Sequence, residues 1–124
     1  MNQTAENIQK LRKCPGTPNC VNSSYPNTDE HIAPIAFQGQ ASEAIAKLQR
    51  IVGSMKRAKI ATATDRYLHI EFTSFLFRFV DDLEILVDAT ESRLEVRSAS
   101  RVGRSDFGVN RKRVEKMRQL FEEN

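Results

Sequence analysis

The middle of the chain alternates apolar and polar residues with a period of two. The pattern recurs four times, over residues 60–64, 67–73, 77–87 and 94–100. This period is typical of half-buried β-strands, and the short connections favour antiparallel neighbours. We therefore expect a four-stranded antiparallel meander, with a bulge or bend at Asp81–Asp82 because two adjacent acids interrupt the apolar pattern. On the third strand, the candidates for inward-facing positions are Phe77, Phe79, Leu83, Ile85 and Val87.

Two other segments have the spacing of amphipathic helices, one over residues 42–57 and one that ends the chain. Ser42 and Asp106 precede their apolar positions and are candidate N-caps. The apolar positions are Ile45, Leu48, Val52 and Met55 in the first segment, and Val109, Val114, Met117 and Phe121 in the second. These stripes predict two helices that cover the apolar face of the sheet, which makes an α+β fold.

A length of 124 residues, with 40% apolar and 28% charged residues, predicts one globular domain. We place a flexible tail at residues 1–13 and a single α+β domain at 14–124, with a short edge strand around Ile35 and Phe37. No apolar run is long enough to cross a membrane. No export signal follows Met1, so the sequence as it stands predicts a cytoplasmic protein, or a periplasmic or lumenal one if an export segment was removed.

A loop rich in proline connects Cys14 to Cys20, and its two prolines and one glycine exclude a regular helix or a central strand. Three states of the cysteines compete: a disulfide, a redox-active or metal-binding thiol pair, and two free thiols. The five intervening residues do not match the two-residue spacing of thioredoxin-type motifs. A zinc site would need further ligands, such as His31 or His69. The sequence favours the disulfide, and we predict no metal and no cofactor.

Charge is distributed unevenly around a net value of +3. Residues 93–118 contain nine Lys or Arg and three acids, whereas residues 65–91 contain two Arg and seven acids. The basic segment has Phe107 as its one aromatic residue and matches no nucleic-acid-reading motif. This composition disfavours nucleic-acid binding and fits a small anion or an acidic protein surface as the partner.

The densest run of cations lies where the fourth strand, a turn at Gly103 and the last helix meet. Arg97 and Arg101 would point the same way from the strand, beside a helix start at 107–110 that offers N–H groups. Asp81 or Asp82 would hold these arginines in place. Alternatively, the arginines pair with carboxylates on neighbouring strands. The outward face that would carry such pairs comprises Tyr67, His69, Glu71, Glu84, Asp88, Glu95, Arg97 and Arg101.

Catalytic signatures are weak in this sequence. It has no phosphate-cradling glycine loop, no Gly-x-Ser-x-Gly elbow and no His-Glu-x-x-His motif. Ser98 and Ser100 have no evident activating base. His31 beside Asp29 is the best candidate for a hydrolase-like site, because a carboxylate can orient an imidazole. The sequence therefore leans against an enzyme.

Four stretches together resemble domain of unknown function family 1499. They are Cys14-Pro-x-x-Pro-Asn19-Cys20-Val-x-Ser23, Asp29-x-His31-x-x-Pro34, Phe79-x-Asp81-Asp82 and the segment from Arg97 to Arg113. Members of this family are similar to small bacterial and plastid-lineage proteins, which often have an exported or lipoprotein-like N-terminus. The resemblance implies no particular reaction. Together with the charge pattern it leads to three hypotheses: a non-enzymatic anion-binding module, a cell-envelope structural or interaction domain stapled by Cys14–Cys20, and a hydrolase. The ligand-binding candidates are Asp81, Asp82, Arg97, Ser98, Arg101, Asp106, Asn110 and Arg113.

Overall fold

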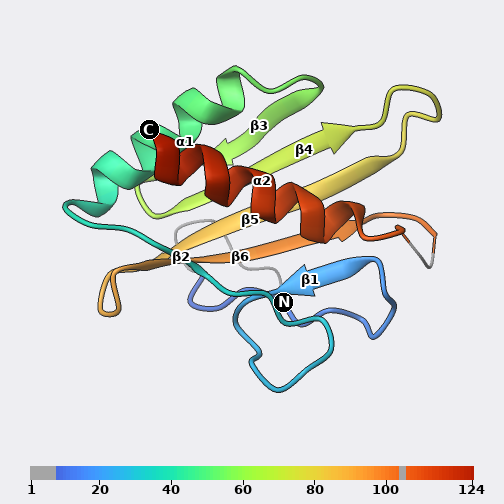
Figure 1. Ribbon diagram of the computed structural model, residues 1–124, viewed down its shortest axis with the longest axis horizontal. Coiled ribbons are helices and arrows are strands. Elements are labelled where there is room, and N and C mark those ends of the chain that lie inside the picture. Colours follow the sequence, from blue (N-terminus) through green and yellow to red (C-terminus); the bar gives the residue numbers. More distant parts are fainter. Residues whose placement is uncertain (1–7, 104–105) are drawn as a thin grey trace.

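A computed structural model describes residues 8–103 and 106–124 of the chain (Figure 1). It is an α+β fold in which two helices lie on one face of a twisted antiparallel sheet (Figure 1). The elements are β1 (Cys20–Asn22), β2 (Ile35–Ala36), α1 (Ala41–Gly53), β3 (Ala58–Ala63), β4 (Tyr67–Thr73), β5 (Val80–Asp88), β6 (Arg93–Ser100) and α2 (Val109–Glu123).

The sheet has six strands, so the prediction of four was wrong. The predicted meander is present as β3 to β6, and β1 and β2 both pair with the outer edge of β6. β1 has three residues and β2 has two, which is too short for a period of two to be recognised. The short edge strand expected around Ile35 is confirmed as β2.

The core lies between the sheet and the helices. Leu68, Ile85 and Val96 from the sheet pack with Leu48 of α1 and Met117 of α2. The predicted apolar stripes are confirmed, apart from Val109 in the second helix. Met55 follows the end of α1, where Ser54 Oγ donates to the Ile51 carbonyl at 2.7 Å, but it is partly buried and packs against the core as predicted. Val109 is 43% exposed.

The N-cap of α1 is Gln40, so the assignment to Ser42 was wrong. The backbone N–H groups of Glu43 and Ala44 both donate to the Gln40 carbonyl, which starts the helical hydrogen bonding before Ser42. The Gln40 side chain makes no capping hydrogen bond. The start of this helix is therefore set by backbone geometry rather than by a side-chain cap.

Strand β5 pairs without interruption through Asp81 and Asp82 on both sides, so the predicted bulge there was wrong. The register shift of this sheet lies instead between Ile60 and Thr62 of β3. Leu83, Ile85 and Val87 face the core as predicted.

Phe77 and Phe79 do not face the core, because they belong to a hairpin loop rather than to β5. Ser74 and Phe79 close this loop, since Ser74 N donates to the Phe79 carbonyl at 2.8 Å and Phe79 N donates to Ser74 Oγ at 2.9 Å. Residues between these two lie beyond the paired strands, and their apolar side chains are left outside the core.

Residues 8–13 cross the face of the sheet opposite the helices. Leu11 is buried there against Tyr67 and Leu86. The side chains of Asn22 and Arg97 both donate to the Arg12 carbonyl. This segment covers part of the second face, and residues 1–7 of the expected tail lie outside the described residues.

The predicted disulfide is confirmed between Cys14 and Cys20, with Cα atoms 5.7 Å apart. It connects the segment that crosses the sheet to β1. Closing a loop this small stabilises a fold by about 2 kcal/mol in the chain-entropy account. The bridge therefore ties residues before Cys14 to the edge of the sheet.

Candidate functional site

The predicted site residues lie on both faces of the sheet. Side chains alternate along a strand, so Asp81 and Ser98 face the helices while Asp82 and Arg97 face the opposite side. We name two groups accordingly. The helix-side cluster comprises Asn19, Asp81, Ser98, Ser100, Asp106, Asn110 and Arg113. The opposite-face cluster comprises His69, Glu71, Asp82, Glu84, Arg97 and Arg101.

Asn110, in the first turn of α2, is the centre of the helix-side cluster and has no exposed surface. Its Oδ1 accepts from Ser98 Oγ at 2.6 Å and from Arg113 Nη1 at 2.9 Å. Its Nδ2 donates to the Asn19 carbonyl at 3.1 Å and to Asp106 Oδ2 at 2.7 Å. One side chain thus joins β6, the Cys14–Cys20 loop and the start of α2.

Asp106 accepts hydrogen bonds from the backbone N–H groups of Gly108, at 2.8 Å, and Asn110, at 2.9 Å. The N-cap is Gly108, two residues after the predicted Asp106, and its φ of 81° lies in the left-handed region that favours glycine. Burial raises the pKa of Asp106. The hydrogen bonds that its carboxylate accepts from Asn110 and Gly108 lower the pKa by more than burial raises it, so the pKa lies below its ordinary value. The chain's own carboxylate therefore takes the N–H donors that were predicted to bind an anion.

Replacing Asp106 with alanine is expected to lower the free energy of unfolding at pH 7 by about 1–2 kcal/mol, the effect of losing a helix cap. The folded-state pKa is below the unfolded value of about 3.9, so the contribution is present above that pH and disappears as pH falls through the folded pKa. Urea unfolding of both proteins between neutral and acidic pH measures this difference. Glu122→Ala, at an exposed site on the same helix, is the control. A difference that stays constant into acid would contradict the capping role.

Arg113 and Asp81 form an ion pair at 2.9 Å, and each side chain is 14% exposed. The guanidinium carbon of Arg113 also lies 4.6 Å from the centre of the Phe72 ring. Both contacts fix the Arg113 side chain between α2 and the sheet. The positive charge of Arg113 is therefore paired with a carboxylate inside the protein.

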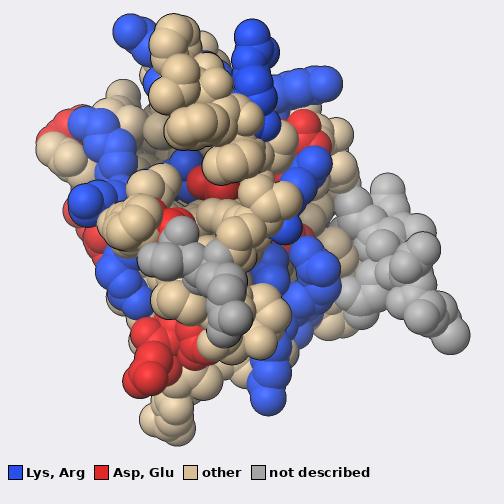
Figure 2. Space-filling view, turned by 90° about the vertical axis from the view of Figure 1, so that its right-hand side faces the viewer, with Lys and Arg blue, Asp and Glu red and all other residues tan. Residues whose placement is uncertain are grey.

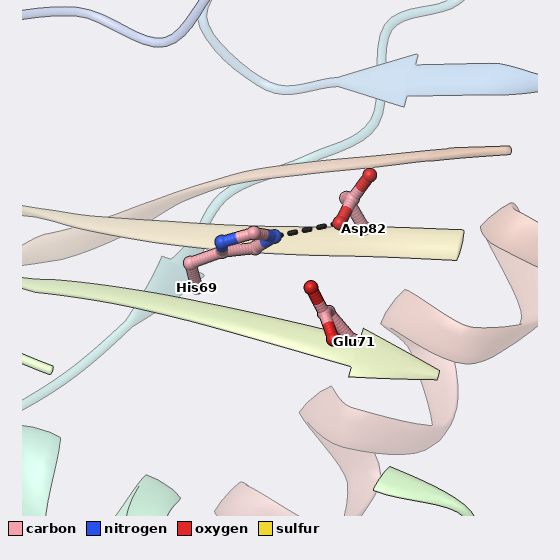
Figure 3. Close-up of side chains that lie close together, drawn as sticks. All are labelled: His69, Glu71 and Asp82. Atoms are coloured by element: carbon pink, nitrogen blue, oxygen red, sulfur yellow. Dashed lines mark hydrogen bonds and ion pairs between the residues drawn. The ribbon is translucent and has the colours of Figure 1, made fainter. Parts of the chain in front are cut away.

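Figure 3 shows the first part of the opposite-face cluster, where His69 and Asp82 point toward one another from β4 and β5. His69 Nε2 lies 2.6 Å from Asp82 Oδ1. Arg101 donates to both oxygens of Asp82, at 2.8 and 2.9 Å, and to Glu71 Oε2 at 2.8 Å. Burial raises the pKa of Asp82, but the hydrogen bonds from Arg101 and His69 outweigh it and lower the pKa overall.

Ligand atoms of His69, Glu71 and Asp82 lie within 4.8 Å of one another, which is close enough to share a metal ion. A histidine with two carboxylates is a donor set that several divalent ions accept. The guanidinium of Arg101 already bridges both carboxylates, so a metal would have to displace charge-assisted hydrogen bonds. As it stands, this group is an ion-pair network.

Arg97 and Glu84 form the buried part of the same cluster. Arg97 is 6% exposed, and its Nη1 lies 3.6 Å from Glu84 Oε1. Tyr67 donates to Glu84 Oε2 at 2.6 Å, and the Nη2 of Arg12 approaches Oε1 at 3.7 Å. Burial lowers the pKa of Arg97, while burial and the contact with Glu84 raise that of Tyr67. Arg97 is enclosed in the fold and does not face solvent.

A groove of about 670 Å³ opens at the end of the molecule where the β4–β5 hairpin meets the β6–α2 turn. Its apolar lining is Phe72, Phe75, Phe79, Val102 and Val109, and its charged lining is Lys56, Arg57, Asp81, Asp106 and Arg113. Figure 2 faces this end and shows uncharged side chains at the top, in the region of the hairpin, with Lys and Arg on both sides. Three of the eight predicted ligand-binding residues (Asp81, Asp106 and Arg113) line the groove.

Sequence reasoning missed this groove because its walls come from segments far apart in the chain. The one signal for it was the apolar run from Phe72 to Val80, which was assigned to strands. Arg104 and Ser105 of the basic stretch lie outside the described residues.

No hydrogen bond joins the side chains of His31 and Asp29 within residues 8–103 and 106–124. His31 lines a separate depression of about 1050 Å³, together with Ser23, Arg93 and Glu95. His31 and Asp29 are close in sequence, but their side chains do not make the hydrogen bond that a catalytic pair needs.

The fold and these clusters define a small α+β domain with two internally paired polar networks and one amphiphilic groove. The chain belongs to the family described as "Protein of unknown function (DUF1499)", whose model matches residues 10–121. This confirms the resemblance seen in the motifs. No curated protein gives a significant match. Within the described part of the chain, neither helix is long and apolar enough to span a bilayer.

Proposed function

We propose that this domain is a non-enzymatic binding module whose groove holds an amphiphilic anion. The observation that carries the proposal is the combination of an apolar lining with two exposed cations, Lys56 and Arg57. Neither forms an ion pair with a carboxylate of the described residues. The volume falls in the range of small-molecule sites, which are mostly apolar with a few oriented polar groups.

The charges within the groove support an anion rather than a cation as the ligand's head group. Asp81 is paired with Arg113, and Asp106 accepts the N–H groups at the start of α2. These acids are neutralised by contacts within the protein. The remaining charge is positive, and the aromatic rings beside it suit a hydrocarbon chain.

The predicted roles of Arg97, Ser98, Arg101, Asn110 and Asp82 as ligand contacts stay predictions. Their internal partners favour a different role, in which they hold β5, β6 and α2 in the arrangement that shapes the groove. The positive charge offered to a ligand then comes from Lys56 and Arg57.

A thermal-melt panel with decanoate, dodecyl phosphate, sulfate and inorganic phosphate tests this proposal. The two amphiphiles are expected to stabilise the protein, by about 2.7 kcal/mol at a concentration of 100 times the dissociation constant. The inorganic anions lack an apolar chain and should give much smaller shifts.

Two groove variants identify the site. Arg57 has a φ of 58°, so Arg57→Gly removes the charge in a backbone conformation that glycine accepts easily. Val109→Asp places an acid at an exposed position on the groove wall. Both should reduce amphiphile binding, whereas Arg50→Ala, an exposed charge on α1 outside this groove, should not. A flat response to the whole panel would refute the groove as a ligand site.

A structural or interaction domain of the cell envelope is the second candidate, and the Cys14–Cys20 disulfide favours it. Disulfides form and persist mainly in oxidising compartments. In that case the two polar clusters serve only to fix the fold. A flat ligand panel would support this function.

A further inference from the structure

The tip of the β4–β5 hairpin carries a concentration of exposed apolar side chains. Phe75 is 77% exposed, Leu76 73%, Phe77 67% and Phe79 53%. Strand β4 ends at Thr73 and β5 begins at Val80, so these residues extend beyond the paired part of the sheet. Folding buries large apolar residues where it can, and an exposed group of this size marks an interaction surface.

Contacts among the tip residues keep the apolar surface together. The rings of Phe77 and Phe79 stack with centroids 5.6 Å apart, and the Arg57 guanidinium lies 5.8 Å from the centre of the Phe75 ring. Ser74 closes the loop through its backbone and its hydroxyl. The aromatic side chains are therefore held together as an apolar protrusion before any partner binds.

Among the described residues, the charges beside this protrusion that have no partner within the protein are positive, because Asp81 is paired with Arg113 and Asp106 accepts the N–H groups at the start of α2. Arg78 lies within the loop, and Lys56 and Arg57 stand beside it across the groove. The sequence from Phe72 to Val80 contains no acid, and the next acid, Asp81, is paired with Arg113. The partner of this surface should accordingly be apolar inside and negatively charged outside.

We propose that the hairpin of residues 74–79 docks onto an anionic lipid bilayer. The aromatic and leucine side chains would enter the boundary between head groups and acyl chains, and Arg78, Arg57 and Lys56 would contact the lipid head groups. Aromatic residues favour this interfacial depth, and basic residues near it are attracted to anionic lipids. The inference rests on the proposed function in one respect: it identifies the membrane as the source of the amphiphile that enters the groove.

The shape of the surface favours a bilayer over a protein. A stable protein–protein contact buries about 800 Å² on each partner and needs an extended complementary surface. The β4–β5 hairpin instead projects beyond the end of the sheet (Figure 1), and a fluid bilayer accommodates a projecting loop without a matching cavity. An acidic protein or a second copy of the chain would need a pocket shaped for the tip.

Co-sedimentation of the full chain with vesicles tests the inference. The vesicles are pure phosphatidylcholine, or phosphatidylcholine with about 30% phosphatidylserine. Binding to the anionic vesicles is expected, with little binding to the neutral ones and a clear decrease at about 0.5 M NaCl, because salt screens the head-group charges.

Two tip variants locate the contact. Leu76→Ser with Phe77→Ser should weaken binding to anionic vesicles by about tenfold or more, and Arg78→Gly, separately, by about fivefold. These side chains do not line the groove, and the φ of 59° at Arg78 is one that glycine accepts. Circular dichroism checks the fold, and Arg50→Ala is the matched charge control.

Equal binding of wild type and tip variants, or no binding to anionic vesicles, would overturn the inference. So would self-association in solution that the double tip variant abolishes, since that would make a second copy the occupant. Loss of vesicle binding with decanoate binding intact would confirm the tip contact, because it separates the tip from the groove. Absent decanoate binding with intact, tip-dependent vesicle binding would refute the groove function alone.

Discussion

Replacing Arg97 with alanine is expected to lower the free energy of unfolding by about 3–5 kcal/mol. Arg97 and Glu84 are both buried, and removal of the guanidinium leaves the carboxylate without its main counter-charge. Glu84 Oε1 has no hydrogen-bond partner among the described residues, so its interaction with Arg97 is electrostatic and is not replaced by another donor. The side chain of Arg12, 75% exposed, can compensate only in part.

Urea unfolding at neutral pH measures this effect, with Arg101→Ala as the control. Arg101 also pairs with carboxylates, but it is exposed to solvent, and exposed pairs contribute about 0–1 kcal/mol. A second variant, Glu84→Gln combined with Arg97→Ala, removes the uncompensated charge and leaves an amide oxygen for Tyr67. It should be more stable than Arg97→Ala alone. Equal losses from Arg97→Ala and Arg101→Ala would refute the buried-pair account.

Replacing Asn110 with alanine is expected to lower the free energy of unfolding by about 3 kcal/mol, since each buried polar group left unpaired costs about 1–3 kcal/mol. The hydroxyl of Ser98, which has no exposed surface, would lose its acceptor. The buried link from α2 to the Asn19 carbonyl would also be lost.

Thermal and urea unfolding of four variants (Asn110→Ala, Ser98→Ala, the double variant and Gln119→Ala) separates this network from a general helix effect. Gln119→Ala, at an exposed position of the same helix, should change stability by less than about 0.5 kcal/mol. Combining Ser98→Ala with Asn110→Ala should cost less than the sum of the single changes, because both remove the same hydrogen bond. Strictly additive losses would contradict a direct interaction between the two side chains.

Both predictions concern stability, and neither residue lines the groove. A folded Arg97 variant should therefore bind decanoate and anionic vesicles as the wild type does. Normal binding by a destabilised Arg97 variant would distinguish the residues that stabilise the sheet from those proposed to contact a ligand. The sequence alone does not make this distinction, because both kinds of residue occur among its clustered cations.

Local pattern predicted much of the sheet and both helices. Alternation along 67–73 and 94–100 predicted strands there, which the structure confirms, with Leu68, Ile70 and Val96 in the core. It failed at Phe77 and Phe79, because apolar residues in a hairpin loop look like a continued strand until the turn is known. Hydrogen bonds between Ser74 and Phe79, which close that turn, have no signature of their own in the sequence.

The sequence by itself determined the α+β class, the family and most of the two helical stripes, whereas the opposite facing of Asp81 and Asp82 became clear only from the regular pairing of β5. Only the tertiary structure decided that β1 and β2 extend the sheet, that residues 8–13 cover Arg97, and that the groove forms beside the hairpin. The physical reason is range. Side-chain periodicity depends on neighbours within a few residues, whereas the burial of a charge and the walls of a groove depend on segments brought together from far along the chain.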